Sequence, residues 1–312
     1  MKDATILNYD DYKDQHGAVV PPLYQNSLFT FENWDAIDKA FDAKADSFIY
    51  SRLMNPTVKI AEEKIAKLCK GEKAKLCASG IAAVTSAILH CVNAGDHIIT
   101  VNSIYGPSLN FIADYLKRKF NITSTFIDGK DPQEFEEAIQ ENTRLIYLES
   151  PGSLTFDLQD LAAVATIAKK HGIMTATDNT WASPVFQKPL ELGIDIEIHS
   201  CSKYICGHSD VVAGVIVGSE DIIDQIILAE HELLGAKMAP FEGWLITRSL
   251  RTLAIRMKAH EESAHYIAQF LEAHDKVKSV FWPGLKSFPQ YTLAQKQMTG
   301  NTGLMSFELA TK

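Results

Sequence analysis

The chain has 312 residues, of which 46% are hydrophobic and 22% are charged, and its formal net charge at pH 7 is −9. These are the values of a globular protein that is too long for one ordinary core, so two domains are the default expectation. No cluster of Lys and Arg is present, which argues against a nucleic-acid-binding protein, and the longest apolar stretches are strand-sized, which argues against a membrane span.

In chain order, the first 54 residues come before any regular pattern. They include Pro21 and Pro22, one expected helix over 34–45, and no apolar core of the kind a signal peptide has. We expect an N-terminal arm over 1–54 that lies on another surface, such as a second subunit.

From residue 55 to 240, helical and strand-like patterns alternate, which is typical of a mostly parallel sheet with helices on both faces. Strands are expected at 74–78, 97–101, 123–127, 145–149, 173–178 and 194–199. Helices are expected at 56–70, 80–93, 107–120, 132–140, 158–171 and 221–234. This region is predicted to be the larger domain, of α/β class.

The alternation of helical and strand-like patterns ends after residue 240. A long helical stretch over 241–274 is broken only by Gly243, and strands follow at 277–282 and 303–309. We expect a smaller C-terminal α/β domain over 241–312.

The cysteines are five in number and match no disulfide or zinc framework: Cys69, Cys77, Cys91, Cys201 and Cys206. They are interpreted as reduced thiols, which favours the cytoplasm. A zinc site at Cys201 and Cys206 with His199 and His208 is an alternative that the spacing disfavours, and no metal is expected.

Four short segments carry candidate chemistry, and three of them follow predicted strands, whose carboxyl ends meet at one edge of a parallel sheet. The turn from Ala78 to Ala83 opens a helix whose N–H groups can hold a phosphate, although such turns also occur for tight packing alone. Asp178 ends a strand, where its carboxylate can pair with a protonated ring nitrogen or cap the next loop.

The other two segments add an amine and further phosphate-binding groups. Lys203 follows a strand and is flanked by the hydroxyls of Ser200 and Ser202, whereas a lone loop lysine is usually solvated surface. Tyr50 and Arg52 lie upstream of the sheet, and the planar guanidinium of arginine suits phosphate.

Together and in this order, these segments resemble the Cys/Met-metabolism (transsulfuration) group of fold-type-I enzymes, which use pyridoxal 5′-phosphate (PLP). The resemblance runs from Pro21 to the last residue and implies that fold, with a seven-stranded type of sheet. Segments 105–108, 149–155, 178–182 and 203–210 are most similar to bacterial cystathionine β-lyase.

The resemblance also implies roles. Lys203 would carry PLP and act as the base, Asp178 would face the pyridine nitrogen, and Tyr105 would stack on the ring. The phosphate would be held by Gly80, Ile81, Ser200 and Ser202, and by Tyr50 and Arg52 of a neighbouring subunit. We therefore expect a homo-oligomer, and the family suggests a dimer of dimers.

The implied reaction is β-elimination of L-cystathionine to homocysteine, pyruvate and ammonia, a step of methionine biosynthesis. The alternatives are a cystathionine γ-lyase, γ-synthase or methionine γ-lyase activity. A catalytically impaired PLP-binding protein is a third, because the chain ends at Lys312, before the region where family members supply an arginine for the substrate α-carboxylate. The C-terminal domain is accordingly expected to be incomplete and to expose the edge of its last strand.

Overall fold

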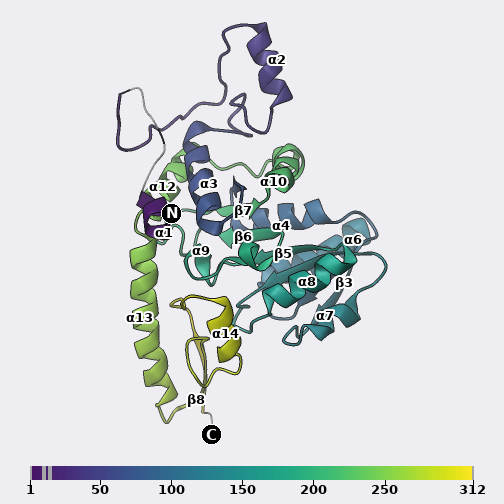
Figure 1. The fold of residues 1–312 in the computed structure, drawn as a ribbon, viewed down its shortest axis with the longest axis vertical. Coiled ribbons are helices and arrows are strands. Elements are labelled where there is room, and N and C mark those ends of the chain that lie inside the picture. Colours follow the sequence, from purple (N-terminus) through teal and green to yellow (C-terminus); the bar gives the residue numbers. More distant parts are fainter. Residues whose placement is uncertain (1, 9–11, 13–15, 311–312) are drawn as a thin grey trace. The chain divides into compact units, whose positions relative to one another are not determined.

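The protein is described here from a computed structural model that covers residues 2–8, 12 and 16–310 (Figure 1). The chain divides into two compact units. Unit 1 contains Met1–His90 and Ile198–Ala254, and unit 2 contains Cys91–Glu197 and Ile255–Lys312.

Seven strands form the main sheet in the order β1-β7-β6-β5-β4-β2-β3. They are β1 Lys73–Cys77, β2 His97–Val101, β3 Thr123–Ile127, β4 Thr143–Glu149, β5 Met174–Asp178, β6 Ile196–Ser200 and β7 Gly214–Gly218. Strand β2 is parallel to β3 and β4, and β4 is parallel to β5, whereas β1 runs antiparallel to β7. Every residue of β2 and β7 is buried, as expected for strands covered on both faces. The predicted mostly parallel sheet is confirmed.

Unit 1 contains the helices α1 Asp3–Asn8, α2 Trp34–Asp42, α3 Pro56–Cys69, α4 Gly80–Cys91, α10 Glu220–Ile226, α11 Glu232–Leu234 and α12 Pro240–Leu250, with a π-helical segment Ile227–His231 between α10 and α11. Helix α3 begins where the sequence predicts, because the Asn55 side chain accepts a hydrogen bond from the Thr57 N–H and Pro56 occupies the first turn.

The predicted helix break at Gly243 is wrong. Gly243 lies inside α12, and the helical stretch is interrupted instead at residues 251–252, before α13 Leu253–Glu272. A Cβ on Gly243 would lie 3.1 Å from Val58 Cγ2, so the glycine lets α12 approach α3 closely. A glycine that ends a helix and one that admits a neighbouring helix look alike in sequence.

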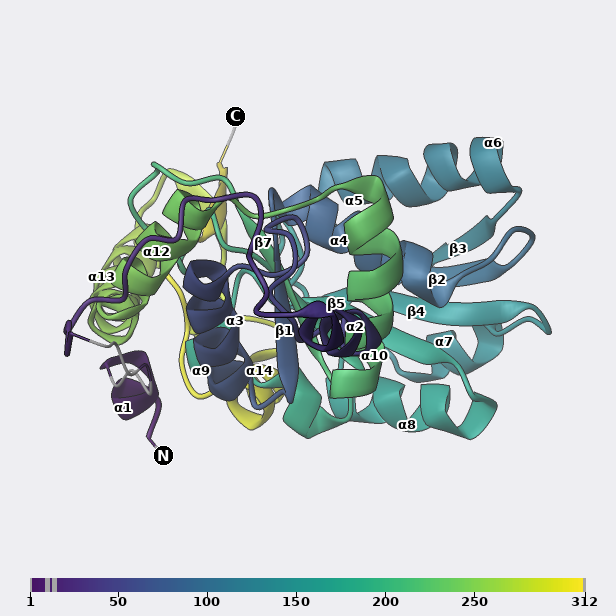
Figure 2. The same cartoon turned by 90° about the horizontal axis from the view of Figure 1, so that it is seen from above.

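Unit 2 contains most of α13 and the helices α5 Gly106–Asn110, α6 Lys117–Phe120, α7 Gln133–Ala138, α8 Leu161–His171, α9 Ser183–Phe186 and α14 Tyr291–Gln297. It also contains a π-helical segment, Phe111–Leu116, and a 3₁₀ segment, Pro189–Leu192. Figure 2 shows α6 on one side of strands β2–β5, with α7 and α8 on the other. The expected helical layers on both faces are confirmed for these strands.

A second core in unit 2 joins residues 156–182 to the C-terminal segment. Trp181 and Trp282 are buried in it, and their ring N–H groups donate to the carbonyl oxygens of Leu304 (3.1 Å) and Thr302 (2.9 Å). Strands β8 Val277–Phe281 and β9 Ser306–Leu309 form a separate antiparallel pair. The last strand thus begins three residues later than predicted, after the chain has passed the two tryptophans.

Within the described residues, no helix combines the length and the apolar character that crossing a membrane requires.

Candidate active site

In unit 1, the amino end of α4 lies against the carboxyl end of β6. A Cβ added to Gly80 would lie 2.8 Å from both Cβ and Oγ of Ser200. A Cβ added to Gly214 would overlap the carbonyl oxygen of Ser79. The two glycines therefore permit a contact that larger residues would prevent, and we refer to Ser79, Gly80, Ser200 and Gly214 as the glycine corner.

The first residues of α4, Gly80 and Ile81, are half-buried at this corner. Ser79 satisfies two donors of the first turn, because its Oγ accepts from Ala82 N–H (3.1 Å) and its carbonyl accepts from Ala83 N–H (3.2 Å). In the described part of the chain, the N–H groups of Gly80 and Ile81 have no hydrogen-bond partner. Two N–H donors at the positive end of a helix dipole suit a phosphate group.

The Ser202 hydroxyl is already engaged. It accepts from the Ala213 N–H at 3.0 Å and lies 3.3 Å from the Ala213 carbonyl oxygen, to which it donates. Its proton must turn away from that carbonyl before it can serve a phosphate. The phosphate-binding role expected for Ser202 stays a prediction.

Lys203 lies in the turn that follows β6. Its N–H donates to Ser200 O (3.1 Å), and its carbonyl accepts from Gly207 N–H (2.7 Å), so the main chain is fixed while the side chain is exposed. No described residue binds the Lys203 ammonium. Burial raises the pKa of the adjacent Cys201 thiol well above its usual range, which keeps that thiol protonated and unreactive.

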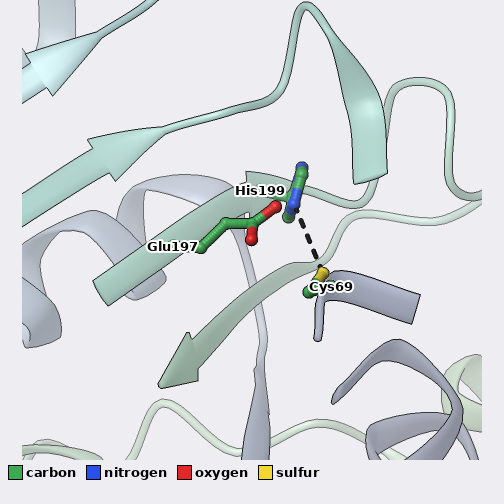
Figure 3. Close-up of side chains that lie close together, drawn as sticks. All are labelled: Cys69, Glu197 and His199. Carbon is green, nitrogen blue, oxygen red and sulfur yellow. Dashed lines mark hydrogen bonds between the residues drawn. The ribbon is translucent and has the colours of Figure 1, made fainter. Parts of the chain in front are cut away.

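A thiol–imidazole contact holds β6 just before Ser200 (Figure 3). Cys69, at the end of α3, places its Sγ 3.8 Å from His199 Nε2, and both residues are buried. Glu197 precedes His199 by two residues, so both side chains point to the same face of β6. His208 has different partners, since its Nδ1 lies 2.5 Å from Cys206 O and 3.4 Å from Ser249 Oγ. The five cysteines are free thiols.

In unit 2, Asp178 ends β5 beside Glu149, which ends β4, and the two residues are partners in the strand register. Asp178 is 7% exposed, and its Oδ1 accepts from the Thr180 N–H at 2.9 Å. The loop-capping interpretation of Asp178 is therefore correct. Capping fixes the orientation of the carboxylate without removing its charge, so the ring-nitrogen role stays open.

Glu149 positions Tyr105, a role that the sequence analysis did not assign. Glu149 is buried, and its two oxygens accept from the Tyr105 N–H (2.6 Å) and the Ser153 hydroxyl (2.7 Å). The side chain of Tyr105 stays 47% exposed, so its ring face is available for stacking.

The pKa of the buried Tyr147 phenol responds to the negative charge of Asp178 and Glu149 at the carboxyl ends of β4 and β5. Burial raises the pKa of its phenol well above the usual range, and the carboxylates of Asp178 and Glu149 raise it further. A cationic N–H placed at this edge would be stabilised by the same charges.

Tyr50 and Arg52 lie together elsewhere in unit 1. The guanidinium carbon of Arg52 is 5.0 Å from the Tyr50 ring centroid, and its Nη2 lies 3.6 Å from Glu232. Neither side chain bonds to Gly80, Ser200 or Lys203 within the described residues of this protomer. Their expected action on a neighbouring subunit remains a prediction.

Gly80→Ala is expected to weaken the binding of PLP, the cofactor implied by the sequence, by about tenfold or more, since overpacking a tight contact typically costs about 1–3 kcal/mol. Titrating the protein with PLP and following its fluorescence gives the dissociation constant. Gly106→Ala is the matched control, because a Cβ at Gly106 would meet no atom within 4 Å. Equal PLP affinity in the two variants would mean that the glycine corner does not hold the phosphate.

The chain is similar to PLP enzymes over nearly its whole length. The sequence model of the Cys/Met metabolism PLP-dependent enzymes matches residues 3–312. An L-methionine γ-lyase from Porphyromonas gingivalis is 44% identical over 295 residues, which cover 94% of this chain and 74% of that protein. A cystathionine β-lyase from Coxiella burnetii is 38% identical over 294 residues, with 94% and 74% coverage.

A solved structure shows the same likeness in three dimensions. A putative O-acetylhomoserine (thiol)-lyase from Campylobacter jejuni superposes with a TM-score of 0.94 and 30% sequence identity. The superposition covers 99% of this chain and 85% of that one. That protein was solved with N′-pyridoxyl-lysine-5′-monophosphate in its chain.

Proposed function

The chain belongs to the Cys/Met metabolism family of PLP-dependent enzymes, and we propose that it releases homocysteine, pyruvate and ammonia from L-cystathionine by β-elimination, with the uptake of one water. Family membership makes it a PLP-dependent carbon–sulfur lyase that acts on small amino-acid substrates. The choice of cystathionine and of β-elimination is the proposal.

The residues present fit PLP. The unpartnered N–H groups of Gly80 and Ile81 suit its phosphate, and Lys203, whose side chain no described residue binds, would supply the unprotonated amine that condenses with its aldehyde. Asp178 offers an oriented carboxylate for its ring nitrogen. Bound PLP would supply an electron sink for the negative charge that develops at the substrate Cα.

The protein's own groups perform the remaining tasks. We propose that Lys203 Nζ takes the proton from the substrate Cα, for which the nitrogen must be unprotonated. With PLP bound, the Asp178 carboxylate would favour the protonated pyridine nitrogen and so strengthen the sink. Tyr105, fixed through its N–H to Glu149, would cover one face of the ring and orient it.

One observation carries the choice of β-elimination. The segments 105–108 and 149–155 both resemble bacterial cystathionine β-lyase, and they are bonded together by the Tyr105 N–H to Glu149 contact. The second segment is also held by the Ser153 N–H, which donates to Ser103 O at 2.6 Å. Two of the four segments that carry the β-lyase resemblance are therefore bonded to each other.

A second candidate is γ-elimination of L-methionine. The P. gingivalis methionine γ-lyase shares 44% identity with this chain, against 38% for the C. burnetii cystathionine β-lyase. Whole-chain identity thus favours the methionine reaction, whereas segments 105–108 and 149–155 favour the cystathionine reaction.

The 2-oxo acid product separates the two reactions, because β-elimination of cystathionine gives pyruvate and γ-elimination of methionine gives 2-oxobutyrate. With PLP and each substrate, we expect kcat/KM for pyruvate release to exceed that for 2-oxobutyrate release by about tenfold, the discrimination that a pocket contact of about 1.4 kcal/mol provides. The two acids are quantified by chromatography after derivatisation. A higher kcat/KM for 2-oxobutyrate from methionine would replace the β-lyase proposal by the γ-lyase one.

We further propose that the enzyme works as a homo-oligomer, a dimer of dimers, in which Tyr50 and Arg52 reach the cofactor phosphate of a neighbouring subunit. The apolar side chains of the arm support this proposal, since Val19 and Trp34 are 82% and 78% exposed in the single chain. The free thiols suit a reducing compartment such as the cytoplasm.

A further inference from the structure

A hollow of about 480 Å³ opens on the surface of unit 1 beside Tyr50 and Arg52. Lys237 lines the same hollow, together with neutral polar residues of the arm such as Gln25 and Asn26. The sequence offers no reason to single out Lys237, which follows a glycine and an alanine between two helices.

The main chain fixes the place of Lys237. It forms an antiparallel bridge with Cys77, the last residue of β1, and the neighbouring Ala236 carbonyl accepts from the Ala78 N–H at 3.0 Å. Lys237 is therefore held at the end of β1, two residues from the start of the glycine corner. Its side chain is exposed.

The two cations of the hollow differ in their partners. Arg52 faces Glu232, a carboxylate that Lys44 also binds at 2.7 and 2.8 Å. The Lys237 ammonium has no carboxylate or other side-chain partner among the residues that the structure describes. Lys237 is thus a cation of the hollow for which the described residues of this protomer supply no carboxylate partner.

We propose that Lys237 acts across the subunit interface as a specificity residue, selecting substrates whose sulfur substituent ends in a carboxylate. This inference rests on the proposed function, in which Tyr50 and Arg52 of one subunit reach the cofactor of its neighbour. A residue in the same hollow then faces the substrate bound beside that cofactor. The distal carboxylate of cystathionine is such a group, whereas the S-methyl group of methionine carries no charge for Lys237 to bind.

Two matched substrates isolate this contact. S-(2-Carboxyethyl)-L-cysteine and its amide, S-(2-carbamoylethyl)-L-cysteine, have the same shape, and β-elimination releases pyruvate from both. The acid alone can pair with the ammonium of Lys237. We expect the wild-type chain to prefer the acid, and this preference to fall as salt is added, because salt screens a partly exposed ion pair.

In Lys237→Gln, kcat/KM for the acid is expected to fall about two- to fivefold through a higher KM, which is the loss that removing an exposed ion pair causes, while kcat/KM for the amide is unchanged. Lys237→Arg should restore the preference. Lys117→Gln, at an exposed lysine on α6, is the matched control and should behave as wild type. PLP absorbance checks that each variant binds the cofactor.

A Lys237→Gln variant that keeps the full preference for the acid would overturn the inference and leave the β-lyase proposal standing. An equal loss for acid and amide would also overturn it, because it would indicate a general structural role. A wild-type chain that releases no pyruvate from L-cystathionine would instead overturn the proposed function, and this inference with it.

Discussion

Lys203→Ala is expected to lower kcat/KM for pyruvate release from L-cystathionine by about 10³-fold or more, within the range that a positioned proton-transfer group contributes. The variant should also lose the visible absorbance of bound PLP. The physical reason is that one nitrogen anchors the cofactor and takes the Cα proton, and no other described lysine lies in that turn. Steady-state kinetics with a coupled pyruvate assay measures the loss.

The fold should survive this substitution. The Lys203 side chain is exposed, and the turn is held by the main-chain bond from Lys203 N–H to Ser200 O. A thermal melting temperature within a few degrees of wild type is therefore expected, and Lys117→Ala should retain full activity. Partial recovery of Lys203→Ala with an added primary amine would support the role as base. Wild-type rates in Lys203→Ala would show that the assignment is wrong.

Asp178→Asn is expected to lower kcat by about 10²–10³-fold, comparable to removing one preorganised electrostatic group from an active site. Asparagine keeps an oxygen for the Thr180 N–H, so the loop after β5 should be unchanged. The substitution removes the negative charge that would hold a proton on the pyridine nitrogen, and the ring then becomes a weaker electron sink. The measurement is kcat under saturating PLP and substrate.

The matched control is Asp114→Asn, which removes an exposed aspartate from the π-helical segment between α5 and α6. It should leave kcat within twofold of wild type, since exposed surface charges contribute little. If Asp178→Asn binds PLP and also stays within twofold, Asp178 serves only as the loop cap.

The elements that the sequence predicts most closely are those with strong local signals. Strands 97–101 and 123–127 match β2 and β3 residue for residue, because each is a short run rich in β-branched residues. Helix α3 begins at its predicted residue because Asn55 and Pro56 define its first turn locally. These features need no knowledge of the tertiary structure.

The features that the sequence did not predict depend on distant contacts. The sequence around Gly243 predicts a helix break, but Gly243 is a packing site against Val58, which lies 185 positions earlier in the chain. The sequence assigns no role to Glu149, although its carboxylate orients Tyr105. The sequence does show that Glu149, like Asp178, is an acid at the end of a predicted strand. Only the strand order, which the structure supplies, shows that the two strands are neighbours.

The glycine corner could be predicted from the sequence only in part. The order of the segments indicated that Gly80 and Ser200 belong to one site, and the structure brings them into contact. The engagement of Ser202 with Ala213 could not be predicted, because it depends on how the loop after β6 folds back toward β7. Local sequence identifies the groups, and the tertiary structure decides which of them are free.

Reducing the PLP-loaded protein with borohydride, and locating the cofactor on its peptides by mass spectrometry, tests whether Lys203 carries PLP. We expect a pyridoxyl phosphate group on the peptide that contains Lys203, with the other lysines unmodified. A stable adduct on a different lysine, or a protein that acquires none after incubation with PLP, would contradict it.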